Sequence, residues 1–218
     1  MRWIWGKVVS VASAMRWLAC MGLRLGPLVL AATSPALAQS APAFIHADGG
    51  AGASPVAYRV INLGTGAIAA YPRINASGQV AFSLIHGDRT DGYFYDGNIV
   101  REMGSLGGRT VYVNDLNDAG QVAGTSLNDA GVENAFVWSL RGGMLDLRAA
   151  PSRGRSYGWA INSHGVVTGA MGDAAHPFRW SVASGVEDLG VTPGIPAPAA
   201  GRVLGDAGLV AGVTTIDD

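Results

Sequence analysis

The chain has 218 residues, of which 14% are charged, and its formal net charge at pH 7 is −1. Residues 39–218 hold 11 arginines, no lysine and 16 acidic residues, so this part alone carries a net charge of −5. A mildly acidic region without basic clusters is a poor match for nucleic acid or anionic lipid, so neither is expected as a partner. The single cysteine, Cys20, precedes this region, which excludes disulfides and thiol chemistry from it.

Residues 1–38 have the composition of an export signal. They hold four basic residues and no acidic one, and an apolar run at 25–32 precedes a small-x-small sequence that ends at Ala38. This order predicts a signal peptide cleaved before Gln39 and a secreted or periplasmic protein of bacterial type. An uncleaved membrane anchor is the alternative, although Arg24 interrupts the roughly 20 apolar residues that a span needs. Three different starts would leave a leader of this kind: Met1, Met15 or Met21.

Residues 39–57 are rich in Ala, Gly, Ser and Pro, and they include His46. This composition predicts a flexible linker. From Tyr58 onward, short apolar segments alternate with glycine-containing turns, and no helical periodicity lasts longer than one turn. We therefore expect one all-β domain over residues 58–218, which is large enough to be stabilised by its core alone.

One nine-residue phrase recurs four times in this domain. It starts with an aliphatic residue, is followed in three copies by Asn, and has Gly at its fifth position. The copies begin 42, 45 and 43 residues apart, and a period of this length indicates a repeat architecture. They occupy residues 74–82, 116–124, 161–169 and 204–212, and the last has Gly205 in place of the Asn.

The second copy serves as the template for one repeat. Residues 111–116 alternate apolar and polar side chains and lead into Asn117, with Gly120 three residues later. Asn at the first turn position and Gly at the fourth favour a tight hairpin built from a type I turn and a bulge. Further strands are expected at 121–126, 134–139 and 144–147, which makes four short antiparallel strands in one repeat.

Four strands in each 40 to 50 residues is the arrangement of a β-propeller blade. The sequence therefore predicts a propeller-like array of four-stranded antiparallel units, arranged as a small or an incomplete ring. The array holds three full units and a partial fourth with two strands, at about 66–108, 109–150, 151–193 and 194–214.

The two ends of the array leave its closure open. Residues 58–63 resemble the last strand of a unit, so pairing with residues 209–214 would join the chain ends and hide the edges. Even then one strand of the fourth unit is missing. The alternatives are an open array, whose exposed edge pairs with a partner or with another copy, and a fragment of a longer repeat protein.

The repeats resemble the HAF family of extracellular bacterial repeats. Residues 116–124 fit its Ile-Asn-x-x-Gly-Gln-Val-x-Gly phrase, and residues 134–138 and 176–180 each fit its His-Ala-Phe-x-Trp phrase with one change. The closing Leu-Gly-Gly of the family occurs at 106–108, whereas residues 92–96 lack both the His and the Trp. The resemblance covers about 58–214 and implies an exported, propeller-like protein, with no catalytic residues to carry over.

Histidine is the first residue type to consider for metal binding or proton transfer. No histidine pairs with another His, Cys or carboxylate at a metal-ligand spacing such as His-x-x-x-His. Because sister repeats have Ser or Ala at the position of His164, we interpret it as a tolerant turn residue. No metal and no cofactor is predicted. The four histidines are His46, His86, His164 and His176.

Asn and Asp residues at 114–118 and 128–129 offer oxygen ligands of the kind that Ca²⁺ prefers. Their spacing does not match an EF-hand loop, and the same residue types are ordinary turn formers, so turns are the favoured interpretation.

The most polar loop, residues 86–91, is the only candidate for catalysis. Asp88 with Asp91 or Asp96 could serve glycoside hydrolysis, which requires two carboxyl groups about 5 to 9.5 Å apart. Aromatic pairs supply another candidate, a surface on which sugars stack, although packing between units is the favoured interpretation. These pairs are Phe136 with Trp138 and Phe178 with Trp180.

The leading hypothesis is an exported, non-catalytic binding or scaffold module that acts at the cell surface, in the periplasm or outside the cell. Its ligand is unknown, with a protein or a polysaccharide as candidates. A propeller-type hydrolase of extracellular or envelope polysaccharide is the alternative, and it requires converging carboxylates. A degenerate fragment is the second alternative, and it predicts a product that does not unfold cooperatively. No catalytic, cofactor-binding or metal-binding residue is predicted.

Overall fold

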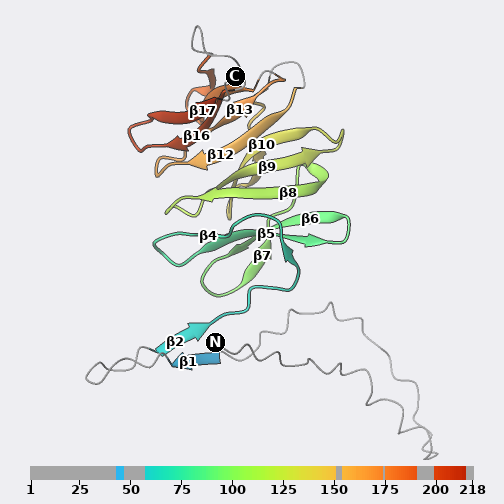
Figure 1. Cartoon of the computed structure of the whole chain (residues 1–218), viewed down its shortest axis with the longest axis vertical. Helices are drawn as coiled ribbons and strands as arrows, with labels where there is room; N and C mark the ends of the chain where they lie inside the picture. Colours follow the sequence, from blue (N-terminus) through green and yellow to red (C-terminus); the bar gives the residue numbers. More distant parts are fainter. Residues whose placement is uncertain (1–42, 47–56, 151–153, 174, 191–198, 215–218) are drawn as a thin grey trace, which may run out of the picture. The chain divides into compact units, whose positions relative to one another are not determined.

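The computed structural model describes residues 43–46, 57–150, 154–173, 175–190 and 199–214 (Figure 1). These residues form strands and turns without a helix, so the all-β prediction is confirmed. The predicted signal peptide at 1–38 and its cleavage site lie outside the described residues. None of the residues in the described ranges belongs to a helix long and apolar enough to cross a membrane.

The first repeat is an antiparallel arrangement around two long strands, β5 (Val80–His86) and β6 (Arg89–Tyr95). Two short segments, β3 (Ala67–Ile68) and β4 (Arg73–Ile74), pair with β5 one after the other and together take the place of a first strand. The fourth strand, β7 (Val100–Glu102), pairs with β6.

The second and third repeats are four-stranded antiparallel meanders, as predicted for each unit. A single parallel bridge, Thr90 to Thr110, joins the sheets of the first two repeats. The strands of the second repeat are β8 (Gly107–Leu116), β9 (Val122–Asn128), β10 (Glu133–Ser139) and β11 (Gly143–Asp146). Those of the third are β12 (Ser156–Ile161), β13 (Val167–Met171), β14 (His176–Ser181) and β15 (Gly185–Asp188).

The fourth repeat consists of the predicted two strands, β16 (Ala199–Leu204) and β17 (Val210–Thr214), which pair only with each other among the described residues. The pairing of 58–63 with 209–214, one of the alternatives for the ends of the array, is not formed among the described residues, where β2 (Ala57–Val60) pairs with β1 (Ala43–His46). The predicted linker over 39–57 contains β1. Phe44 and Ile45 are good strand formers, and pairing within a short loop costs less entropy than joining the two ends of a domain.

The hydrophobic core lies between successive repeats. One cluster combines Phe94 and Met103 of the first repeat with Phe136 and Trp138 of the second, and the rings of Phe94 and Trp138 are 5.0 Å apart. A second cluster combines Val137 and Leu147 with side chains of the third repeat. Both predicted aromatic pairs are buried, so the prediction that they pack between units is confirmed and neither forms a sugar-stacking surface. The members from the third repeat include Ile161, Val167, Phe178 and Trp180.

Two glycines of the recurring phrase allow these phenylalanines to pack. Phe136 lies opposite Gly124 on the neighbouring strand, and Phe178 lies opposite Gly169. A Cβ atom at Gly124 would come within 2.6 Å of the Phe136 ring and would also collide with a backbone carbonyl. In the first repeat Phe82 replaces the glycine, and Phe94 lies opposite Ala81 instead.

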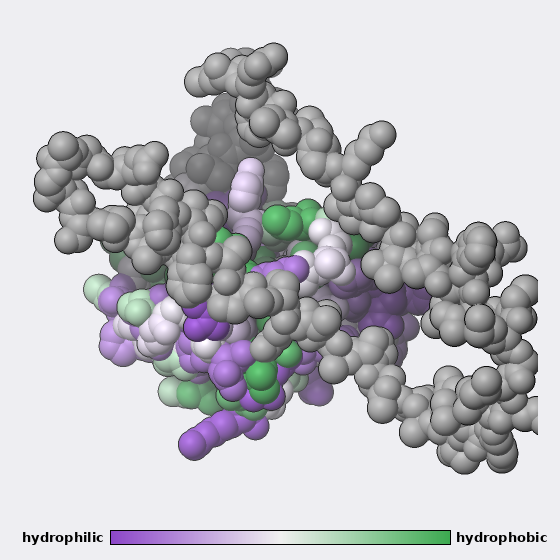
Figure 2. All heavy atoms as spheres, turned by 90° about the horizontal axis from the view of Figure 1, so that it is seen from below, coloured by the Kyte–Doolittle hydropathy of each residue, from purple (hydrophilic) through white to green (hydrophobic). Residues whose placement is uncertain are grey.

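Hydrophobic residues also reach the surface at the first repeat, where Ile68, Tyr71 and Ile74 are between 64% and 86% exposed. On the face shown in Figure 2, hydrophobic and hydrophilic residues are interspersed.

Candidate functional site

The recurring Asn forms a tight turn and also joins one repeat to the next. Within the turn, the Asn117 Oδ1 atom accepts a hydrogen bond from the Gln121 amide, and the Gly120 amide donates to the Asn117 carbonyl. Gly120 has a φ of 74°, which confirms the predicted left-handed turn position. The Nδ2 atom of Asn117 donates to the carbonyl oxygen of Asn162 in the following repeat, at 2.9 Å.

The same bond forms at each junction between described repeats. Asn75 donates to the carbonyl of Asn117 at 3.1 Å, and Asn162 donates to the carbonyl of Gly205 at 3.2 Å. We call this series of three bonds the asparagine ladder. It ends at Gly205, which accepts from Asn162 and has no side chain with which to donate onward.

In the first two repeats, a glutamine four residues after the ladder asparagine is hydrogen-bonded to it. Gln79 accepts from Asn75 Nδ2 at 2.7 Å, and Gln121 accepts from Asn117 Nδ2 at 2.9 Å. Each glutamine lies over the turn glycine of the next repeat, since a Cβ atom at Gly120 would be 2.9 Å from Gln79 Oε1, and one at Gly165 would be 2.8 Å from Gln121 Oε1. The glutamines therefore fill the space between successive turns.

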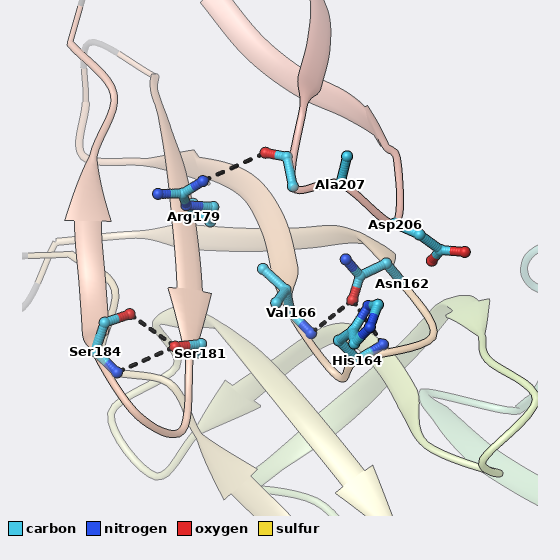
Figure 3. A pocket seen from close by; sticks show the side chains of 9 residues that line it. Asn162, His164, Val166, Arg179, Ser181, Ser184, Asp206 and Ala207 are labelled. Atoms are coloured by element: carbon cyan, nitrogen blue, oxygen red, sulfur yellow. Dashed lines mark hydrogen bonds between the residues drawn. The ribbon is translucent and has the colours of Figure 1, made fainter.

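The third repeat has Val166 where the first two have glutamine, and a pocket lies beside this valine. Arg179 approaches the turn glycine in place of the missing amide and donates to the Gly208 carbonyl at 3.4 Å. The pocket lies between the turn joining β12 to β13 and the turn joining β16 to β17, with a volume of about 320 Å³ (Figure 3). We call it the seam pocket. It is lined by Asn162, His164, Val166, Arg179, Ser181, Ser184, Asp206, Ala207 and Gly208.

Charges inside the seam pocket are largely balanced. Arg179 forms an ion pair with Glu187 at 2.6 Å, so its positive charge is partly neutralised at the rim. Asp206 accepts hydrogen bonds from the side chain and the backbone amide of Ser163, and these bonds lower the pKa of the Asp206 carboxyl. Ser181 and Ser184 share a hydrogen bond of 2.7 Å between their hydroxyls (Figure 3). The pocket therefore offers both donors and acceptors without a dominant charge.

Ser163, His164 and Asp206 lie together but do not form a nucleophilic triad. In such a triad the histidine stands between the serine and the acid, and takes the serine proton. Here the Ser163 hydroxyl donates directly to Asp206 at 2.8 Å, while His164 is 3.3 Å from the same hydroxyl. The acid therefore contacts the serine and not the histidine, so the histidine is not oriented as a base. His164 occupies the predicted turn.

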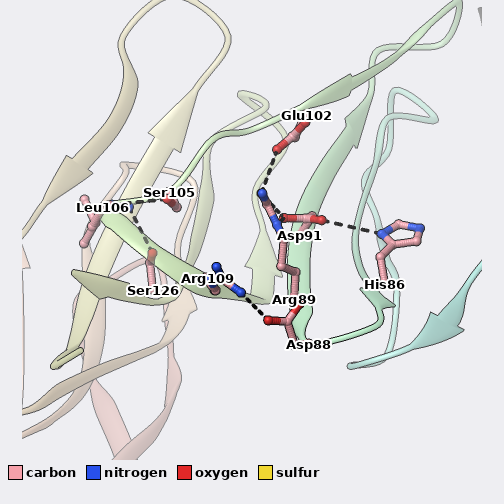
Figure 4. Close-up of polar contacts among 10 residues, drawn as sticks. His86, Asp88, Arg89, Asp91, Glu102, Ser105, Leu106, Arg109 and Ser126 are labelled. Atoms are coloured by element: carbon pink, nitrogen blue, oxygen red, sulfur yellow. Dashed lines mark hydrogen bonds and ion pairs between the residues drawn. The ribbon is translucent and has the colours of Figure 1, made fainter. Parts of the chain in front are cut away.

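Each of the three candidate carboxylates pairs with an arginine, and Figure 4 shows Asp88 with Arg109 and Asp91 with Arg89. Asp88 pairs with Arg109, Asp91 pairs with Arg89 at 2.9 Å, and Asp96 pairs with Arg101 at 3.0 Å. Bonds from the Ile99 and Asn98 amides, and then Arg101, lower the pKa of Asp96. A general acid needs a raised pKa, so Asp96 has the opposite shift from the one required.

Distance also separates the outer two of these carboxylates. Asp88 precedes β6 and Asp96 follows it, and a strand rises about 3.3 Å per residue, which places the two backbone positions roughly 26 Å apart. The separation required for glycoside hydrolysis is about 5 to 9.5 Å. Asp91 lies between them on β6 with both carboxylate oxygens engaged, by Arg89 and by His86 at 3.5 Å. The carboxylates of this loop serve as ion-pair partners.

The remaining histidine and turn predictions have clear structural counterparts. His86 ends β5 beside Asp91, and His176 begins β14 and contacts Asp188 at 3.2 Å. Among the described residues, no group of three or more His, Cys, Asp or Glu side chains could hold a metal ion. Asn128 Oδ1 accepts from the amides of Ala130 and Val132, which confirms that the second Asn-Asp sequence is a turn.

Sequence reasoning missed the seam pocket and the ladder. The signal for the pocket was the sixth position of the phrase, which reads Gln79, Gln121, Val166 and Leu209 in the four copies.

No known protein family matches the chain, and no curated protein shows significant similarity to it.

Proposed function

We propose that the chain is an exported, non-catalytic binding and scaffold module, built as an open propeller-like array of repeats like those of the HAF family. The seam pocket carries this proposal. Its volume lies at the lower end of the 300 to 1,000 Å³ that is usual for small-molecule sites. Its balanced donors and acceptors suit an uncharged, polyhydroxylated ligand, such as one sugar unit of an extracellular polysaccharide.

The placement of polar side chains supports a role in binding over one in catalysis. At the turns, Asn and Gln side chains are engaged in joining repeats, and the acidic side chains of the polar loop are engaged by arginines. Neither group leaves an acid and a base facing each other across a cleft. A polysaccharide hydrolase would need such a pair.

The binding proposal is tested by titrating the purified protein with glucose, galactose, mannose and N-acetylglucosamine, followed by calorimetry or NMR. Val166→Gln should weaken binding at least about tenfold, because the introduced side chain would fill the seam pocket as Gln121 fills the space above Gly165. Val166→Thr is the matched control, since it keeps the volume of valine and should bind like the native protein. Equal binding by the Gln variant, or no binding of any of these sugars, would overturn the assignment of the pocket.

Export and integrity are tested separately. The amino terminus of the protein recovered from the periplasm or the medium should begin at Gln39. A single cooperative thermal transition is expected because the core clusters bridge successive repeats. Gradual unfolding without a transition would favour a degenerate fragment instead.

A further inference from the structure

The second, third and fourth repeats carry a β-bulge at the same place in their first strands. In β8 the register shifts between Val113 and Asp115, which leaves Asn114 as an extra residue on its strand. The same shift occurs around Trp159 in β12 and around Arg202 in β16. A bulge changes the direction of a side chain, and bulges are frequent next to functional sites.

The three bulge residues form one row across the domain, because the first strands of successive repeats lie side by side (Figure 1). The Nδ2 atom of Asn114 donates to the carbonyl of Gly158, next to Trp159, at 2.7 Å. The central guanidinium carbon of Arg202 lies 3.8 Å from the centre of the Trp159 ring. We call Asn114, Trp159 and Arg202 the bulge row.

The bulge row changes from repeat to repeat, unlike the turn phrase that begins two residues later. It consists of an amide, an indole and a guanidinium in turn. The first two are half-buried and the third is exposed, whereas the residue before each of them is buried. One scaffold therefore presents a different polar or aromatic side chain from each of these repeats, which is how repeat proteins build extended binding surfaces.

Tyrosines two residues earlier extend the bulge row into an aromatic surface. Tyr157 stacks on Trp159, with ring centres 6.0 Å apart and an angle of 17° between the ring planes. Tyr112 holds the corresponding position in β8 and is 40% exposed. Partly exposed aromatic rings of this kind combine an apolar face with a polar edge, so they suit a sugar ring, which has both C–H and hydroxyl groups.

Arg202 has hydrogen-bond donors available for a ligand. Its contact with the Trp159 ring is its one interaction with the part of the chain that the structure describes. A guanidinium in contact with an aromatic face keeps the N–H groups at its edge, and these match the two oxygens of a carboxylate.

The carboxylates beside the bulge row do not neutralise Arg202. Glu133 forms an ion pair with Arg155 at 3.7 Å. Asp115 accepts a hydrogen bond from the backbone amide of Ile161 at 2.9 Å. The bulge row therefore has a positive group without an acidic partner among the described residues, and this favours a ligand with a negative charge.

We propose that the bulge row binds a uronate unit of an acidic polysaccharide. The carboxylate of the sugar pairs with Arg202, and the sugar ring packs on the exposed part of Tyr157 and Trp159. Single-stranded nucleic acid also combines stacking with arginine contacts, but residues 39–218 carry a net charge of −5, which repels a polyanion. None of the residues of the bulge row lines the seam pocket, so this is a second site that does not depend on a ligand in that pocket.

Calorimetry with tetragalacturonate and with its methyl ester, which keeps the sugar rings but removes the charge, tests this assignment. The acid should bind at least about tenfold more tightly than the ester, because only the acid forms a charge-assisted bond to Arg202. Arg202→Gln should abolish this difference by weakening the acid alone. Arg141→Gln is the matched control, since Arg141 is an exposed arginine in the turn that joins β10 to β11, and this variant should bind both ligands as the native protein does.

The aromatic part of the site is tested by changing Trp159. Trp159→Ala should weaken the acid and the ester alike, by at least about fivefold, because stacking does not depend on the charge of the sugar. Trp159→Phe keeps an aromatic ring and should recover most of the affinity. The melting temperature of each variant is measured in parallel. A loss of affinity for both ligands in Arg202→Gln, together with a lower melting temperature, would mean that Arg202 only joins repeats and would overturn the proposal.

Three further results would overturn it. They are equal affinities for the acid and the ester, no binding of the acid, and binding of an oligothymidylate of the same charge as tightly as the acid. Val166→Gln, which fills the seam pocket, should leave uronate binding unchanged, and its loss would place the uronate in that pocket instead. Binding of neutral sugars by Arg202→Gln remains measurable, so failure of the bulge row and failure of the seam pocket are distinguishable.

Discussion

The side-chain amide of Asn117 donates a hydrogen bond to the backbone carbonyl of Asn162, a residue 45 positions later in the chain. Both asparagines are buried, with exposed fractions of 6% and 5%. Because each also closes its own turn, one residue type fixes the hairpin and the position of the next repeat. The recurrence of the phrase is therefore explained by how the repeats are joined.

Close packing at the phrase glycine predicts a strong effect of a single methyl group. Gly124→Ala should destabilise the protein by about 1 to 3 kcal/mol, because the new Cβ would collide with the Tyr112 carbonyl and the Phe136 ring. Chemical denaturation measures this change. Gly205→Ala is the control, since its nearest neighbour would be the Leu209 carbonyl at an ordinary 3.8 Å, and it should be neutral or slightly stabilising. Equal effects of the two variants would contradict the packing account.

Filling the seam pocket should stabilise the junction between the third and fourth repeats. Val166→Gln would place an acceptor near Asn162 Nδ2, as Gln121 does for Asn117, and would add roughly 0.5 to 1.5 kcal/mol to the free energy of unfolding. Arg179 would move away from Gly208 and keep its ion pair with Glu187. Thermal unfolding measures the gain, and a lower melting temperature would show that the glutamine position is not equivalent in this repeat.

We expect the stability of the protein to depend on pH through the Asp96 carboxyl. Its pKa is lowered in the folded protein, chiefly by the Ile99 and Asn98 amides. A lowered folded pKa gives stability that is present above the unfolded value of about 3.9 and is lost as the pH falls through the folded value. Asp96→Asn keeps an oxygen acceptor but removes the charge. Between pH 5 and 3 (an interval set by that reference pKa of about 3.9), the native protein should lose more stability than the variant does. Parallel curves would contradict this cause.

Much of the local structure could be predicted from the sequence because it depends on short-range rules. The turn at Asn117 and Gly120 follows from the conformations that these two residues favour. The register of the first repeat could not be predicted from the 42-residue spacing of Phe94 and Phe136. It depends on Phe82, whose ring occupies the place of a glycine and stacks on Tyr93 at 5.5 Å. The strand pairing of the first repeat is therefore shifted by one residue, so that Phe94 lies opposite Ala81, and this shift is a consequence of packing across two strands.

The candidate site was less predictable than the fold. The change from Gln121 to Val166 is visible in the sequence, but the position of Gln121 over Gly165 of the next repeat is known only from the structure. The polar loop was the sequence-based candidate for catalysis because its carboxylates are close in sequence. A strand separates Asp88 from Asp96, and arginines engage both.

The most direct test of the account concerns the asparagine ladder, and it compares Asn117→Ala with Asn128→Ala by denaturant unfolding. The Oδ1 atom of each residue accepts hydrogen bonds from backbone amides of its own turn. Of the two, only Asn117 also forms a hydrogen bond to another repeat. We expect Asn117→Ala to cost about 2 to 4 kcal/mol and Asn128→Ala only about 1 kcal/mol, because a buried carbonyl of the next repeat also loses its partner in the first variant. Equal losses in the two variants would contradict a joining role for the recurring asparagine.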